Sequence, residues 1–341
     1  MRDELELLRA ANPVPADEGR WRDRPLDATA ERGLNRLLHQ SRTRRARRRL
    51  VLRAEAAVLA LVAVLAFTLT DAGSSPAVAA PAALVPHAAA AEPSLAGLAR
   101  IARARARTAG PADGPRRGSH LQSWTLSMGT GPDTASPVTV PEERITRWNA
   151  DGSGSELVVA TDPQHPGRPI IHDADGRWRT VSDGKVLHRA TYPPGSGAPH
   201  GGLAARTRPP TDPAALRALL TSLYGAANGD DGAATVPQLL MALSSFRQEW
   251  TPGPRETAAI VELLADTGGL RPAGAVTDRL GRRGQAFVHD GPDGAMDATR
   301  QMVILDPRTG QLLGTEITFT KDLPDFRITA GEVMSYEAWM P

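Results

Sequence analysis

Two histidines and two aspartates stand close together in the middle of the chain and are candidate metal ligands. His165, His172, Asp173 and Asp175 offer the nitrogen and oxygen donors that divalent cations use. Their spacing matches no pair of ligands on one helix face, and Asp-Ala-Asp-Gly is typical of a hairpin turn. A calcium loop would need glutamate at its twelfth position, where Gly184 stands. The pattern favours a turn, and we predict no metal ligand and no cofactor.

The chain carries none of the common signatures of a catalytic site. A serine hydrolase places its serine in a Gly-x-Ser-x-Gly elbow between a strand and a helix, whereas Ser153 lies in an Asp-Gly-Ser-Gly hairpin-type connection. We find no phosphate-binding loop and no dinucleotide fingerprint. The chain contains no cysteine, which excludes disulfides, thiolate zinc sites and a cysteine nucleophile. We therefore expect a non-enzymatic protein without catalytic residues.

Three tryptophans fall on segments that we expect to be neighbouring strands. Trp124, Trp148 and Trp178 can pack into the core or against a face of the sheet. Alternatively, they line an aromatic groove for an acyl chain or a peptide. The sequence leaves both interpretations open.

A cluster of arginines directly precedes the main apolar run of the chain. Residues 50–70 carry only Arg53 and Glu55 as charged side chains. As a helix this run would span roughly 30 Å, the thickness of a bilayer core. The positive-inside rule then places the N-terminal flank in the cytoplasm. The basic side chains expected to flank the membrane and to attract anionic lipid are Arg42, Arg44, Arg45, Arg47, Arg48 and Arg49.

A cleaved signal peptide is the rival interpretation of this apolar run. Residues 77–79 (Ala-Val-Ala) offer a cleavage pattern, but about fifty residues precede the run, far more than an ordinary signal peptide has there. We therefore predict a single-pass protein of the cell membrane. Its expected parts are a cytoplasmic tail over residues 1–49, a transmembrane helix over 50–70, an Ala/Pro-rich spacer with one basic helix over 71–118, and an extracytoplasmic domain over 119–341.

Alternating sheet and helix patterns predict an α+β fold for the outer domain. Short turns rich in Asp and Gly separate the first strands, which is typical of an antiparallel meander. These strands are expected over residues 120–128, 143–149, 156–161, 169–172, 177–181 and 186–190. In the spacer, Ser94 is expected to cap the basic helix.

Three helices and a second group of strands follow. Thr211 is a good N-cap for the first helix, which we expect to end at Gly225. The other two carry apolar side chains at helical spacing over residues 239–246 and 260–264, and further strands are expected over 284–289, 302–305, 311–320 and 327–339. In the strand over 311–320, alternation places Leu313, Thr315, Ile317 and Phe319 on one face. Residues 306–310 read as a tight turn with Gly310 at positive φ.

Two blocks, residues 274–284 (GAVTDRLGRRG) and 303–314 (VILDPRTGQLLG), resemble a family of actinobacterial single-pass membrane proteins of uncharacterised function. Its members are often encoded beside extracytoplasmic-function sigma factors, which implies a regulatory role. Zinc-containing anti-sigma factors carry a His and Cys motif in their cytoplasmic part, whereas this chain has only His39 there. The outer domain also resembles the half-barrel of lipoprotein-carrier and periplasmic sensor domains. Further segments similar to the family are residues 3–9, 13, 122–124 and 211–213.

These expectations define a sensor or regulatory partner in the envelope, in which the tail contacts a sigma factor and the outer domain binds a lipid or peptide. The alternative is a membrane-tethered, carrier-like module for a lipid or lipopeptide. The arginines of residues 100–107 do not indicate direct nucleic-acid binding, because anionic lipid or cell-wall polymer is the more natural counterpart outside the membrane.

The regulatory interpretation predicts that residues 1–49 bind the sigma factor encoded nearest to the protein. Leu34, Leu37 and Leu38 form a narrow apolar stripe on a predicted helix of the tail, so polar substitutions there should abolish the interaction. A bacterial two-hybrid assay or a pull-down measures it. Absence of binding by a demonstrably expressed tail would favour the carrier-like alternative.

Overall fold

A computed structural model of the protein describes most of the chain after residue 80. The described segments are 81–88, 93–110, 113–127, 138–161, 171–174, 177–180, 185–194, 207–228, 234–290, 298–326 and 328–340. Every described residue belongs to one compact unit. The predicted tail, transmembrane helix and flanking arginine cluster lie outside the described residues.

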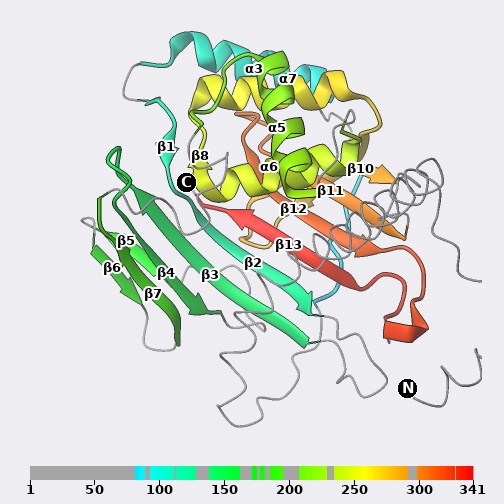
Figure 1. The fold of residues 1–341 in the computed structure, drawn as a ribbon. Helices are drawn as coiled ribbons and strands as arrows, with labels where there is room; N and C mark the ends of the chain where they lie inside the picture. Colours follow the sequence, from blue (N-terminus) through cyan, green and yellow to red (C-terminus); the bar gives the residue numbers. More distant parts are fainter. Residues whose placement is uncertain are drawn as a thin grey trace, which may run out of the picture. The chain divides into compact units, whose positions relative to one another are not determined.

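The domain is built on an open antiparallel sheet of nine strands, in the order β7-β4-β3-β2-β13-β12-β11-β10-β9 (Figure 1). This confirms the α+β class and the antiparallel sheet. The end strands β7 and β9 do not pair with each other, so the sheet is not closed. The strands are β2 (His120–Ser127), β3 (Val138–Trp148), β4 (Gly154–Ala160), β7 (Val186–Tyr192), β9 (Arg271–Thr277), β10 (Arg283–Asp290), β11 (Thr299–Leu305), β12 (Leu312–Phe319) and β13 (Val333–Trp339).

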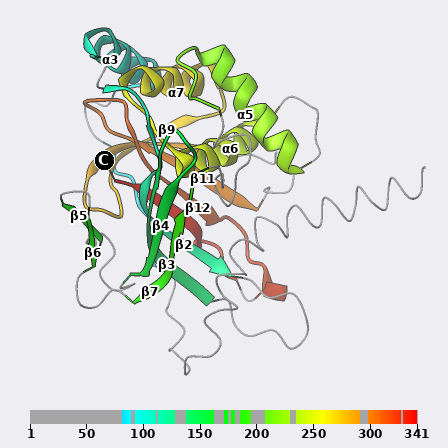
Figure 2. The same ribbon diagram turned by 60° about the vertical axis from the view of Figure 1, so that its left-hand side comes forward.

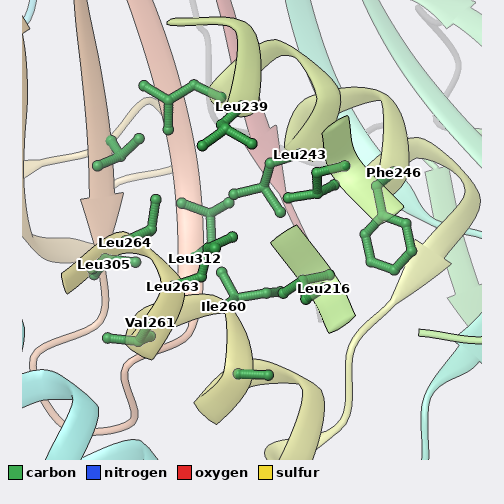
Figure 3. Close-up of a cluster of buried hydrophobic side chains, with 14 of the residues drawn as sticks. Leu216, Leu239, Leu243, Phe246, Ile260, Val261, Leu263, Leu264, Leu305 and Leu312 are labelled. Atoms are coloured by element: carbon green, nitrogen blue, oxygen red, sulfur yellow. The ribbon is translucent and has the colours of Figure 1, made fainter. Parts of the chain in front are cut away.

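Three helices, α5 (Pro213–Asn228), α6 (Val236–Glu249) and α7 (Pro254–Thr267), gather on one face of the sheet. Their leucines and isoleucines meet sheet residues such as Leu305 and Leu312 in the main apolar cluster (Figure 3). The predicted apolar positions of α6 and α7 are confirmed as buried. At α5 the prediction was wrong at both ends: Asp212, not Thr211, accepts the Ala215 N–H at 2.8 Å, and the helix continues past Gly225.

The opposite face of the sheet is also apolar. Along β11, Val303 and Leu305 point into the helix-side cluster, whereas Met302 and Ile304 belong to a second cluster on the other face. Alternation along a strand therefore buries side chains in two directions. Such a sheet needs covering layers on both faces.

The β5–β6 hairpin (Ile171–Ala174 and Arg177–Thr180) forms a sheet of its own. The meander was therefore wrong at this point, because β4 pairs with β7 rather than with β5. The hairpin lies away from the helices (Figure 2). Ile171 packs with Ile145, Leu157 and Val159 on the far face of the sheet, where its N–H donates to the buried carboxylate of Glu143 at 2.9 Å.

Helix α3 (Leu95–Thr108), expected within the spacer, is part of the folded core. The Ser94 side chain accepts the Gly97 N–H at 3.2 Å, as predicted. Leu98 and Ala102 are buried against the helix-side cluster, and α3 lies along α7 (Figure 2). The core therefore begins before residue 119, because the apolar stripe of α3 completes the helix layer.

Strand β12 does not alternate as expected. Thr315 and Ile317 are only half-buried, whereas Glu316 between them is fully buried. The strand carries register shifts beside Leu312 and at Ile317–Thr318, which break the two-residue period. The predicted apolar face was therefore wrong, and a charged side chain occupies the interior.

The turn between β11 and β12 contains a glycine, Gly310, whose substitution should destabilise the fold. Gly310 has φ +74°, and an added Cβ would lie 2.9 Å from Ala102 Cβ of α3. Gly310→Ala should lower the free energy of unfolding by about 2–3 kcal/mol, through strain and overlap together. Gly281→Ala is the matched control, since Gly281 has φ +76° but open space around it, and it should cost only about 1 kcal/mol. Urea unfolding of both variants measures this, and equal losses would contradict the predicted overlap.

Candidate functional site

Two adjoining hollows, each of about 560 Å³, open beside the end of the helix layer, and we call them together the basic groove. Gly114, Pro115 and Arg208 line both hollows. The first continues along residues 208–211 to Arg255 and Glu256 at the start of α7, and the second along β1 to two tryptophans. Each volume suits a small ligand or one repeat of a polymer.

A short strand pair positions the aromatic end of the groove. β1 (Arg116–Arg117) pairs antiparallel with β8 (Trp250–Thr251), directly after α6 (Figure 1). The Arg117 guanidinium lies over the Trp250 ring, 5.2 Å from its centroid, a cation–π contact. The Gly118 N–H donates to the Glu249 carbonyl at 2.7 Å, and the Thr251 hydroxyl donates to the Gly118 carbonyl at 2.8 Å. These bonds fix the loop after α3 to the end of α6.

The charge of the groove is mainly positive. Four arginines line it, namely Arg116, Arg117, Arg208 and Arg255, against the two acids Asp113 and Glu256. Arg116, Arg208 and Arg255 are exposed, whereas Glu256 is buried. Burial and the nearby charge of Arg116 lower the pKa of Arg147, on the adjacent strand β3.

Trp148 and Trp250 give the groove an apolar wall. Trp148 is half-buried at the end of β3, where its ring packs on Tyr192 with the centroids 5.1 Å apart. Trp250 is 4% exposed. Arginines beside indole rings suit a ligand that joins an anionic group to a flat or apolar part.

A buried arginine contacts the backbone of Trp250, which lines the groove. Arg247 of α6 donates from Nη1 to the Trp250 carbonyl at 2.9 Å and lies 5.2 Å from the centroid of the Trp339 ring. Burial lowers its pKa to about 9, although the negative charge of Glu337 acts in the opposite direction. Glu337 accepts hydrogen bonds from Ser244 and Gln248, and burial raises its pKa.

Glu249 lies next to the groove, one residue before Trp250. Burial, followed by repulsion from Glu156, raises its pKa to about 7, against the attraction of Arg144. Arg144 is already engaged with Glu142 at 3.1 Å and Glu156 at 3.4 Å. Glu249 is thus a carboxyl group that titrates near neutrality at the edge of the site.

The structure separates the three tryptophans for which the sequence left two interpretations open, packing in the core or an aromatic groove. Trp148 lines the groove, whereas Trp124 is 1% exposed and stacks on Tyr336 in a buried cluster, so it belongs to the core. The backbone of Trp178 pairs with Asp173 in the β5–β6 hairpin, and the side chains of both lie outside the described residues. Ser153 lies in the β3–β4 turn, where its hydroxyl donates to Asp151 at 2.6 Å.

The other candidate ligands fall largely outside the described part of the chain. His165 and Asp175 are not described, and His172 is described only in its backbone. Within the described segments, no group of three or more His, Asp or Glu could hold a metal ion. None of the helices described after residue 80 is long and apolar enough to cross a membrane.

In comparisons with known proteins, neither a protein-family model nor a curated protein matches the chain. The groove is therefore defined by its own geometry. Sequence reasoning missed Trp250, Arg208 and Arg255, because Arg208 lies far along the chain from the segment that carries the other two. The available signals were the Pro-Arg-Arg-Gly segment before the first strand and the Trp-Thr-Pro-Gly-Pro segment between two helices.

Glu249 predicts a pH dependence of stability. The folded protein keeps a proton on Glu249 up to about pH 7, whereas the unfolded chain loses it near pH 4.5, so stability should fall as the pH rises through this interval. Glu249→Gln should remove this fall. The free energy of unfolding of the variant, relative to that of the wild type, should rise by about 1–2 kcal/mol from pH 5 to pH 8, a figure that allows for partial solvent screening. Urea unfolding at the two pH values measures it. Parallel pH profiles for both proteins would contradict the raised pKa.

Proposed function

We propose that the protein is a non-enzymatic envelope sensor whose outer domain binds an anionic ligand in the basic groove. The observation that carries this proposal is the convergence of four arginines and two tryptophans, from separate segments, on two joined hollows. Arg208 belongs to both hollows, so a linear ligand with repeated anionic groups can engage it together with Arg255 and Arg117.

The shared chemistry of suitable ligands is a phosphodiester joined to a polyol. It occurs in phospholipid headgroups at the outer surface of the membrane and in cell-wall polymers beyond it. Both are accessible from the side of the membrane where we place the domain. Such a ligand offers the guanidinium groups oxygen acceptors, and its C–H groups can pack on the half-buried indole of Trp148.

The carrier-like alternative draws support from the open sheet with helices on one face, which is similar to a half-barrel. A lipid carrier needs an apolar cavity between these layers. Here that space holds packed side chains from the four described α-helices and from five strands of the nine-stranded sheet, among them Leu220, Phe246 and Trp339. We therefore favour binding at the groove over enclosure of an acyl chain.

Signalling requires a path to the cytoplasm. We propose that residues 50–70 cross the membrane, that the arginine cluster anchors the inner side, and that residues 1–49 contact a sigma factor. The composition of these segments supports this arrangement.

The binding proposal is tested with the full chain in nanodiscs of neutral lipid. The probes are soluble poly(glycerol phosphate), phosphatidylglycerol vesicles and phosphatidylcholine vesicles. We expect the protein to bind one of the two anionic probes and not to bind phosphatidylcholine. Binding of poly(glycerol phosphate) indicates a polymer ligand, and binding of phosphatidylglycerol vesicles indicates a lipid headgroup. Arg208→Glu should weaken binding at least about tenfold, because it reverses a charge shared by both hollows.

Arg308→Glu is the matched control, because its side chain is 88% exposed in the β11–β12 turn and lines neither hollow. It makes the same change of net charge. Equal weakening by both variants would indicate attraction to the overall charge and would refute the groove as the site. Failure of every anionic probe would refute the proposed ligand class.

A further inference from the structure

Residues 81–87, which we call the strap, lie across the face of the sheet opposite the helices. Ala82 pairs with Glu332, directly before β13, and His87 pairs with Ala275 on the end strand β9. Between them, Leu84 packs against the apolar cluster formed by residues of β9 to β12. The strap therefore covers part of the second apolar face.

A buried ion pair holds the strap by its backbone. Glu316 is fully buried and accepts the Leu84 N–H at 2.8 Å. Its partner Arg279 donates from Nε at 3.1 Å, lies 5.2 Å from the centroid of the Tyr336 ring, and donates from Nη2 to the Ala82 carbonyl at 2.8 Å. Both charged groups thus use the strap to complete their hydrogen bonds, which buried charges require.

The sheet edge is shaped for the same segment. His87 and Ala275 exchange two backbone hydrogen bonds of 2.8 Å, so the strap adds to β9 as an extra strand would. Gly274 has φ +121°, and a Cβ there would lie 2.5 Å from the His87 carbonyl oxygen. Only glycine lets the strap approach so closely.

A continuous series of contacts leads from the basic groove toward the strap, and we call it the ladder. Arg117 lies over Trp250, and the Trp250 carbonyl accepts from Arg247. Arg247 lies over Trp339, and the Trp339 carbonyl accepts from Arg282 Nη1 at 2.6 Å.

The ladder ends in the β9–β10 turn. This turn carries Arg279, and we call the ion pair of Arg279 with Glu316, which holds the strap, the clamp. Arg282 donates from Nε to Asp278 at 2.7 Å and from Nη2 to the Leu313 carbonyl at 2.9 Å. Asp278 directly precedes Arg279 in the β9–β10 turn, and it accepts the N–H groups of Leu280 and Arg282. A displacement of Arg282 would therefore move the turn that positions Arg279 against Glu316.

We propose that occupancy of the basic groove is coupled to docking of the strap through the ladder. This regulation rests on the proposed binding function of the groove. An anion that draws the Arg117 guanidinium away from Trp250 removes the first contact of the ladder and weakens the hold of Arg279 on the strap. Since the strap lies within the predicted spacer, shortly after the predicted span, its release transmits binding toward the N-terminal part of the chain.

The absence of cysteine from the chain allows a direct assay of docking. Ala82→Cys and Glu332→Cys place thiols on a bridged antiparallel pair, whose geometry suits a disulfide. In the full chain under mild oxidation, the rate of intrachain disulfide formation reports how often the strap is docked. Glu316→Gln, which weakens the clamp directly, should slow the reaction and serves as the positive reference.

Arg117→Ala in this background tests the ladder without any ligand. We expect disulfide formation to slow at least about threefold, the size of effect typical of coupled residues. Arg255→Ala is the matched control, because Arg255 also lines the groove but has no contact in the ladder, and it should leave the rate unchanged. Equal rates for Arg117→Ala and the parent, with Glu316→Gln slowed, would overturn the coupling.

The ligand arm uses poly(glycerol phosphate) as the probe. Slower disulfide formation in its presence, lost in Arg208→Glu, is expected. An Arg117→Ala effect without binding of poly(glycerol phosphate) would exclude the polymer as the ligand source while leaving the coupling intact. Probe binding that leaves the disulfide rate unchanged would overturn the coupling while leaving the binding function intact.

Discussion

Burial of apolar side chains on both faces of one open sheet is the constraint on which the rest of the structure depends. Val303 and Leu305 face the helices, whereas Met302 and Ile304 face the other way. Each face has to be removed from water, at a gain of about 25 cal/mol per Å². The four helices of the described segments cover one face, and the strap and the β5–β6 hairpin contribute to covering the other.

Several carboxylates buried by this layering accept hydrogen bonds from the neighbouring layer and so connect the layers. Glu143 holds the hairpin through Ile171, Glu316 holds the strap through Leu84, and Glu337 joins β13 to α6. An isolated buried carboxylate would be costly, so each requires donors from the covering element. The basic groove forms where the helix layer ends, since the loop after α3 and the segment between α6 and α7 meet there.

The local patterns of the sequence predicted most of the elements. The apolar spacing of α6 and α7, the cap at Ser94 and the turn at Gly310 are each confirmed, because all depend on neighbours within a few residues. The predicted apolar face of β12 was wrong, since register shifts there are set by the partner strands. The partners of β4 and β7 depend on pairing across a distance in the chain, which turn chemistry alone does not determine.

The sequence by itself therefore determined the α+β class, the helices, most strands and the absence of thiol chemistry. Only the tertiary structure decided that Trp124 is core while Trp148 meets Trp250 and Arg208 in a groove, and that Glu316 is buried beneath the strap. The physical reason is that a site made from distant segments leaves no local period in the sequence. Its arginines and acids become a groove or a clamp only when packing of the layers brings them together.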